Sequence, residues 1–238
     1  MCFTVSFEGK AIKAVKEHLI NNKNLKMNGE FSDVYYLVSG FSHPRLPVIK
    51  KHSIDISEWG LIPSFVTDEE KANELANMTL NARSDTIHEK PSFRNSIKSN
   101  RCVLPLDGFY EWQQAGKIKL PYYIYPTDET VFYLGCIYNT WVNKNTGEIR
   151  DTFSIITTEA NPLMEIIHNT KKRMPLILPK YALETWVDPS TSINEINNMM
   201  KPYPDDLISA YTITQNAGNA RFNRNIPEIK QRIEPSLF

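Results

Sequence analysis

The sequence has few cysteines, no excess charge of either sign and no long apolar run. Its 3 cysteines lack Cys-x-x-Cys spacing, which argues against a disulfide framework and a cysteine-rich zinc site. The 27 lysine and arginine residues balance 27 aspartate and glutamate residues, so net charge gives no sign of a nucleic-acid partner. No apolar run approaches the roughly 20 residues of a membrane span, and the N-terminus lacks a signal-peptide pattern. We therefore expect a cytoplasmic protein that does not contact membranes.

Composition and periodicity predict one α+β domain. Hydrophobic residues make up 41% of the chain and charged residues 23%, as in ordinary globular proteins. Apolar spacing and capping signals predict helices over residues 8–22, 67–78, 161–168, 181–187 and 193–200, the second of them capped at Thr67. Alternating and β-branched runs predict strands over residues 34–39, 47–56, 102–106, 122–125, 131–138, 153–156 and 207–214. The sequence has no repeat, glycine-rich phosphate loop or dividing linker, so we assign these elements to a single domain.

Cys2 is the first candidate for chemistry. With Met1 as initiator, a small second residue permits methionine removal, and the mature chain would begin with a free aminothiol. An α-amine has a pKa of about 8, so part of it is neutral and nucleophilic at pH 7. Such an amine forms a Schiff base with an aldehyde, and the thiol then closes a five-membered thiazolidine. The alternative is a buried cysteine that acts as a small hydrophobe.

Glu111 is the second candidate. The run Asp-Gly-Phe-Tyr-Glu-Trp at residues 107–112 places it between aromatic side chains, just beyond a predicted strand. Such surroundings raise a carboxyl pKa by desolvation and suit the group to proton transfer. A strand-end glutamate that faces solvent is the alternative, and the sequence leaves both open.

His168 is the third candidate. It ends the helix predicted after Asn161 and precedes the basic residues Lys171, Lys172 and Arg173. A histidine in this place either interacts with the helix dipole or serves as an acid or base near neutral pH. No His-x-x-x-His spacing or carboxylate pairing indicates a metal site, and we expect no metal and no cofactor.

A local excess of basic residues lies in the middle of the chain. Residues 83–119 contain seven basic residues, which include Arg83, Arg94 and Arg101, against four acidic ones. Arginine suits phosphate groups, and the aromatic residues Trp59, Phe65 and Trp112 could stack on unpaired bases. Packing in the core is the alternative for each aromatic residue.

Several segments in order resemble the SRAP (SOS response-associated peptidase) family. They are Met1-Cys2, Trp-Gly-Leu-Ile-Pro at 59–63, Asn-Ala-Arg-Ser-Asp-Thr at 81–86, residues 101–112 and residues 161–175. The resemblance covers most of the chain as one SRAP-like domain over residues 1–238, with a looser match from about residue 215. It implies a compact α+β domain with a curved, barrel-like, mostly antiparallel β core and several short flanking helices.

The resemblance also implies a function in the DNA damage response. A protein of this family covers abasic sites in single-stranded DNA and links to them covalently through Cys2, with lyase- or peptidase-like chemistry. By the same resemblance, Asn81 positions the aminothiol, Glu111 is the acid–base residue, and His168 acts on the sugar hydroxyl during ring opening. The residues implied for DNA binding are Arg83, Trp59, Pro63, Arg94, Trp112 and Arg173. We expect a monomer in the cytoplasm, associated with the nucleoid if the source is bacterial.

The chain departs from the family pattern in two places near these residues. Many members continue Met-Cys with Gly-Arg, whereas Phe3 and Thr4 stand here, so a positive charge beside the nucleophile is missing. The family usually has one residue between the histidine and the Arg-Met-Pro run, whereas residues 169–172 separate His168 from Arg173.

Two other functions are compatible with these residues. In an N-terminal-nucleophile hydrolase or autopeptidase, Cys2 attacks an amide and its own amine serves as the base. In a non-covalent single-strand binder, the arginines and aromatic residues bind DNA and Cys2 has no chemical role.

Overall fold

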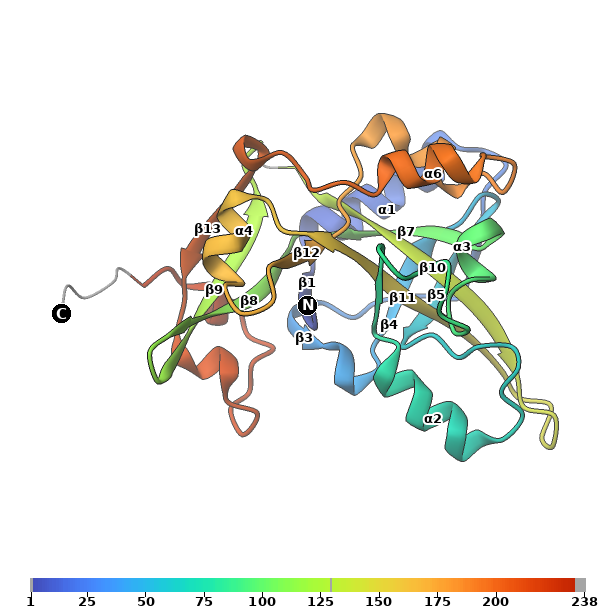
Figure 1. Ribbon diagram of the computed structural model, residues 1–238, viewed down its shortest axis with the longest axis horizontal. Coiled ribbons are helices and arrows are strands. Elements are labelled where there is room, and N and C mark those ends of the chain that lie inside the picture. Colours follow the sequence, from blue (N-terminus) through green and yellow to red (C-terminus); the bar gives the residue numbers. More distant parts are fainter. Residues whose placement is uncertain (1, 129, 234–238) are drawn as a thin grey trace.

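Two β-sheets that share one hydrophobic core form the centre of the protein (Figure 1). The computed structural model describes residues 2–128 and 130–233. The smaller sheet has the strand order β13-β9-β8-β1-β3. Its strands are β1 (Thr4–Phe7), β3 (Tyr35–Ser39), β8 (Gly108–Ala115), β9 (Ile118–Pro126) and β13 (Ile208–Thr212). Because β1 is an inner strand, the N-terminal segment is held between two other strands.

The larger sheet closes on itself. Its order is β12-β11-β10-β7-β4-β5-β2, and a further parallel pairing of β11 with β5 joins β11, β10, β7, β4 and β5 into a barrel. The barrel strands are β4 (Arg45–Ile49), β5 (Ser53–Trp59), β7 (Arg101–Leu106), β10 (Phe132–Val142) and β11 (Ile149–Glu159). The strands β2 (Lys26–Asn28), β6 (Asn81–Arg83) and β12 (Arg173–Pro175) extend it. The pairings of β5 with β2 and β11, and of β6 with β11, are parallel and the others antiparallel, so the predicted barrel-like core is confirmed.

Short helices surround the sheets (Figure 1). The α-helices are α1 (Gly9–Asn21), α2 (Glu69–Met78), α3 (Ser96–Ser99), α4 (Pro162–Ile167), α5 (Leu183–Val187) and α6 (Ile193–Met199). Single 3-10 turns are η1 (Gly40–Ser42), η2 (Lys180–Ala182), η3 (Asp205–Leu207), η4 (Gln215–Gly218) and η5 (Pro227–Lys230). No helix within residues 2–128 and 130–233 is long and apolar enough to cross a membrane.

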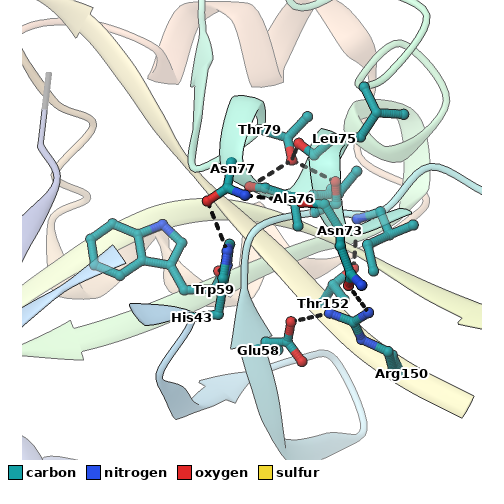
Figure 2. A network of polar contacts seen from close by, with 12 residues as sticks. His43, Glu58, Trp59, Asn73, Leu75, Ala76, Asn77, Thr79, Arg150 and Thr152 are labelled. Carbon is teal, nitrogen blue, oxygen red and sulfur yellow. Dashed lines mark hydrogen bonds and ion pairs between the residues drawn. The ribbon is translucent and has the colours of Figure 1, made fainter. Parts of the chain in front are cut away.

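A polar network holds α2 to the barrel (Figure 2). Arg150 of β11 forms an ion pair with Glu58 of β5 and donates a hydrogen bond to Asn73 Oδ1 of α2 at 2.8 Å. At the C-terminal end of the helix, Thr79 Oγ1 donates to the carbonyl oxygen of Leu61 at 2.6 Å. These bonds connect α2 to the segment that follows β5.

The structure confirms most predicted elements and corrects three details. The N-cap of α2 is Asp68, which accepts a hydrogen bond from Lys71 N, rather than Thr67. The strand predicted over residues 47–56 is two antiparallel strands, β4 and β5, joined by a turn. Glu111 lies inside β8 rather than beyond a strand. The cap predicted at Asn161 is confirmed, since its side chain accepts a hydrogen bond from Met164 N at 2.9 Å.

A buried carboxylate fixes the junction between β1 and α1. Asp107 Oδ2 accepts hydrogen bonds from Glu8 N at 2.7 Å and Ala11 N at 3.2 Å, and its Oδ1 accepts one from Lys10 N at 3.0 Å. A carboxylate here satisfies N–H groups that have no partner within the helix and interacts favourably with its dipole. Because Asp107 directly precedes β8, these bonds hold the N-terminal segment against β8.

Candidate active site

Cys2 lies just before β1 and has no exposed surface. β1 pairs with β8, and this register, continued two residues toward the N-terminus, sets Phe3 opposite Glu111. The carbonyl oxygen of Phe3 accepts a hydrogen bond from Gly40 N at 2.8 Å, which fixes the backbone next to Cys2. Burial and then the negative charge of Glu111 raise the pKa of the Cys2 thiol. The thiol is therefore protonated at neutral pH.

Asn81 contacts Cys2 directly. Its Nδ2 donates a hydrogen bond to the carbonyl oxygen of Cys2 at 2.9 Å, across 79 residues of sequence. The pairing of β6 with β11, in which Asn81 lies opposite Ile155, holds the side chain in this place. Asn81 Oδ1 is buried and has no hydrogen-bond partner among residues 2–128 and 130–233. A hydrogen bond from an N–H or O–H group to this buried acceptor is therefore energetically favourable.

Glu111 is almost fully buried, so it does not face solvent as a strand-end glutamate would. Desolvation raises its pKa to about 7 from an ordinary value of 4.5. A carboxyl group with this pKa is present in both protonation states at neutral pH and can donate or accept a proton. Gly108 helps to place it, because a Cβ at Gly108 would collide with the carbonyl oxygen of Ile124 on β9. The absence of a side chain there lets β8 lie close against β9.

His168 is buried at the end of α4. Its Nδ1 lies 2.8 Å from the carbonyl oxygen of Arg173, and because that oxygen can only accept, we assign the ring proton to Nδ1. Nε2 is then the basic nitrogen of the ring. Burial lowers the pKa of His168, so the ring is neutral at neutral pH.

The residues inserted between His168 and Arg173 form a compact turn. Lys171 N and Lys172 N donate to the carbonyl oxygen of His168 at 3.2 and 2.8 Å, and Lys172 has a left-handed φ of 48°. Asn169 anchors the turn to β8, since its Oδ1 accepts from Gln114 N at 3.0 Å and its Nδ2 donates to Gln114 O at 2.9 Å. The turn returns the chain to His168, so the insertion does not separate His168 from Arg173.

Glu111 and His168 line one open cleft of about 840 Å³. Its walls come from the residues that follow Cys2, the β8–β9 hairpin, the turn after α4 and the segment 215–224. Figure 1 shows the start of β1 in the middle of the molecule, between the hairpin of β8 and β9 and the barrel. The cleft therefore lies beside the N-terminal segment and contains two groups that can transfer protons.

Arg83 and Arg173 lie on either side of one carboxylate. Arg83 Nε donates to Asp85 Oδ1 at 3.0 Å, and Arg173 Nη1 lies 3.6 Å from Asp85 Oδ2. Arg83 is exposed, whereas Arg173 is buried and donates to the Thr157 carbonyl oxygen at 2.5 Å. Of these two arginines, both expected at DNA, Arg83 thus presents its side chain at the surface and Arg173 supports the strands beneath.

Trp59 and Pro63, both expected to border DNA, are buried instead. Trp59 Nε1 donates a hydrogen bond to the carbonyl oxygen of Leu80 at 2.8 Å. Figure 2 shows His43 next to Trp59, with its Nδ1 2.7 Å from the Trp59 carbonyl oxygen and its Nε2 3.1 Å from Asn77 Oδ1. With no exposed surface, the Trp59 ring has no face on which a base can stack. The burial of Trp59 agrees with the core-packing alternative for this residue, and Pro63 is buried in the same segment.

Trp112 and Arg94, the other residues implied for DNA binding, differ in position. Trp112 is half-buried and lines the cleft, as expected of a residue that contacts a ligand there. Arg94 is exposed in the segment before α3 and does not line the cleft. The structure therefore brings Trp112, and not Arg94, to the candidate site.

Phe41 and Arg224 line the cleft and were not singled out in the sequence, and Lys119 was counted there only as part of the basic excess over residues 83–119. Lys119 also lines the cleft, and the side chain of Phe41 is 56% exposed. An exposed aromatic residue and two cations carry no motif, so only their position marks them as functional candidates. The remaining thiols are structural, since Cys102 and Cys136 lie opposite each other on β7 and β10 in the core. Among the described residues, no group of three or more His, Cys, Asp or Glu side chains could hold a metal ion.

Comparisons with known proteins agree on one family. Residues 1–220 match the family described as SOS response associated peptidase (SRAP). The chain is 36% identical over 173 residues to the abasic site processing protein YoqW of Bacillus subtilis (strain 168), covering 72% of this chain and 73% of that protein. It is 35% identical over 150 residues to the abasic site processing protein HMCES of Gallus gallus, covering 55% of this chain and 44% of that protein. A crystal structure of a protein from Bacteroides thetaiotaomicron matches with a TM-score of 0.87 and 42% identity, over 98% of this chain and 100% of that one.

Proposed function

Since the chain belongs to the SOS response associated peptidase family, we propose that it processes abasic sites and captures them covalently through Cys2 in single-stranded DNA. The relatives named abasic site processing proteins support the substrate. The observation that carries the proposal is the convergence of Asn81, Glu111 and His168 around the N-terminal segment, from three distant parts of the sequence.

Capture begins with the amine of Cys2. Removal of Met1 gives this residue a free α-amine, part of which is neutral at pH 7 because its ordinary pKa is about 8. The thiol is a weaker initial nucleophile here, because burial keeps it protonated. A ring-opened abasic deoxyribose carries an aldehyde at C1′, and the amine nitrogen bonds to this carbon while the carbonyl oxygen takes up a proton. The resulting carbinolamine still carries a hydroxyl group.

Closure then forms a thiazolidine. The carbinolamine hydroxyl accepts a proton and leaves as water, the C1′–N bond becomes an iminium, and the Cys2 sulfur adds to C1′. The thiol proton is released, and C1′ ends bonded to nitrogen and sulfur at an unchanged oxidation level. Glu111, with a pKa of about 7, is suited to protonate the departing hydroxyl and then to accept the thiol proton.

Asn81 positions Cys2, and His168 promotes opening of the sugar ring. Asn81 holds the Cys2 carbonyl oxygen through Nδ2, and its buried Oδ1 accepts a hydrogen bond from the new amine in this proposal. His168 Nε2 takes the proton from the C1′ hydroxyl of the closed sugar, the bond between C1′ and the ring oxygen breaks, and that oxygen takes up a proton to become the C4′ hydroxyl as the aldehyde forms. The adduct protects the lesion because the reactive aldehyde no longer exists.

The test is an incubation with a single-stranded oligonucleotide that carries one abasic site, followed by denaturing electrophoresis. Wild-type protein should give an adduct that survives denaturation, and Cys2→Ala should give none. Cys136→Ala, which changes a cysteine in the barrel core, should still form the adduct, and an oligonucleotide without the abasic site should not react. Adduct formation by Cys2→Ala at the wild-type rate would contradict the proposal.

A further inference from the structure

The last part of the chain that the structure describes, residues 213–233, contacts both edge strands of the smaller sheet, and we call it the C-terminal strap. It leaves β13 at one edge and reaches β3 at the other, where Asn225 Oδ1 accepts a hydrogen bond from Tyr36 N at 2.8 Å. It then returns to β13, where Ile233 N donates to the carbonyl oxygen of Thr212 at 2.9 Å. The strap thus satisfies backbone groups that edge strands otherwise leave exposed.

A small hydrophobic cluster, distinct from the main core, lies under the strap. Its buried members come from β3, β8, β9 and the strap, and they are Leu37, Tyr110, Tyr123, Ile213, Ala217 and Ile229. In Figure 1 the red C-terminal segment lies beside β8 and β9, the strands of this hairpin. The strap is therefore packed on β8, the strand that carries Glu111, although residues 221–233 lie beyond the part of the chain that matches the family.

The strap also forms one wall of the cleft that contains Glu111 and His168. Its residues in that wall are Gln215, Gly218, Asn219 and Arg224. Arg224 Nη1 donates a hydrogen bond to the carbonyl oxygen of Ala217 at 3.4 Å, which connects the two halves of the strap. The position of the strap on the sheet therefore sets the shape of the cleft on this side.

Lys230 attaches the strap to the N-terminal segment. Its Nζ forms an ion pair with Glu8 Oε1 and lies 5.0 Å from the centre of the Tyr123 ring. The side chains of Lys230 and Glu8 are 19% and 17% exposed, so solvent screens this pair less than an exposed one. Glu8 Oε1 also accepts a hydrogen bond from Ser6 Oγ of β1 at 3.0 Å. This contact joins the strap to the strand that begins two residues after Cys2.

We propose that Lys230 is a positioning residue for the capture reaction, which holds the C-terminal strap, and with it one wall of the cleft, against the strand that follows Cys2. A mostly buried ion pair that also lies over an aromatic ring fixes a segment better than an exposed ion pair does. Lys230 does not line the cleft, so it acts through the strap and not on the substrate. Its role in capture rests on the proposed function, whereas its attachment of the strap rests on these contacts alone.

Hydrogen exchange followed by mass spectrometry tests the attachment without DNA. Lys230→Met removes the charge but keeps the apolar stem, and backbone amides of residues 215–230 should exchange about fivefold faster than in the wild type, while those of β10 keep their rates. Lys230→Arg keeps the cation and should exchange as the wild type does. Arg232→Ala is the matched control, because Arg232 is exposed and its Cζ lies 5.4 Å from the Tyr211 ring, and it should leave exchange of residues 215–230 unchanged.

The rate of adduct formation, measured over a range of concentrations of a single-stranded abasic oligonucleotide, tests the consequence for capture. Lys230→Met should raise the concentration that gives half the maximum rate about fivefold, with the maximum rate within about twofold of wild type, because a displaced wall weakens binding and leaves the reacting groups in place. Glu8→Gln should act in the same direction. In the Glu8→Gln background, Lys230→Met should have a smaller effect, because the charge of its ion-pair partner is already gone.

The two measurements separate this inference from covalent capture. The proposal is overturned if the strap exchanges at wild-type rates in both Lys230→Met and Glu8→Gln, or if Lys230→Met and Arg232→Ala reach half the maximum rate at the same concentration. If the wild type forms no adduct while the strap of Lys230→Met exchanges faster, the proposed function fails and the attachment by Lys230 stands. Glu8→Gln provides the same test if Lys230→Met does not fold.

Discussion

Replacing Glu111 with glutamine should stabilise the protein at neutral and alkaline pH while slowing adduct formation. The pKa of Glu111 rises from 4.5 to about 7 on folding, chiefly through desolvation. The folded state therefore binds the proton more tightly than the unfolded state. The stabilising contribution of the protonated carboxyl group is complete below pH 4.5 and is lost as the pH rises through about 7.

Glutamine has the shape of the protonated carboxyl group and does not ionise, so the variant avoids this loss. A pKa that rises from 4.5 to about 7 on folding corresponds to about 3 kcal/mol in unfolding free energy at pH 8. At pH 5 the same linkage gives less than about 1 kcal/mol. Adduct formation by the variant should fall about 100-fold or more, because glutamine does not transfer protons.

Urea unfolding of both proteins at pH 5 and pH 8 measures the stability effect. The midpoint should shift between the two proteins at pH 8 with an unchanged m-value. Glu148→Gln is the control, because Glu148 lies exposed in the loop between β10 and β11 and should change stability little at either pH. If the unfolding free energies of wild type and Glu111→Gln keep a constant difference from pH 5 to pH 8, the reasoning about Glu111 is refuted.

Three further variants test other parts of the account. Asn81→Ala removes the 2.9 Å hydrogen bond to Cys2 and should slow adduct formation about tenfold in a quenched gel assay, with unfolding free energy lowered by about 1 kcal/mol. Equal rates for the variant and the wild type would contradict a positioning role. Trp59→Ala leaves a cavity in the core and should destabilise the protein by about 3 to 5 kcal/mol in urea unfolding, whereas a DNA-contacting residue would change binding without changing stability. His168→Ala should slow adduct formation by about 100-fold or more, and the rate on an oligonucleotide with a pre-opened aldehyde should recover if ring opening is its step.

The amino-acid pattern was sufficient for most local structure. Asn161 followed by proline begins α4 because the side chain caps Met164 N, and the apolar run from Cys102 forms a fully buried strand. Thr67 failed as a cap because Asp68, one residue later, bonds to Lys71 N. Thr and Asp are both common N-cap residues, so the sequence does not decide which of two neighbours caps a helix. The geometry of the side chain decides it.

The features that the amino-acid pattern did not predict depend on contacts between residues far apart in the sequence. Glu111 was left between a solvent-facing and a buried alternative, and the structure buries it close to Cys2, a residue far away in the sequence. Trp59 belongs to a motif of the family, yet the motif alone does not distinguish a framework residue from one that contacts DNA. Asp107 fixes the start of α1 from 96 to 99 residues away, which no local signal reports.

Capture as a thiazolidine requires that both the amine and the thiol of Cys2 bond to the abasic C1′. The chain has 3 cysteines, so alkylation of denatured adduct counts the thiols that remain free. The mass of the adduct before alkylation should equal the protein without Met1 plus the oligonucleotide, less one water. After alkylation the adduct should carry two alkyl groups and the unreacted protein three. Three alkyl groups on the adduct, or an adduct that retains Met1, would contradict capture as a thiazolidine at Cys2.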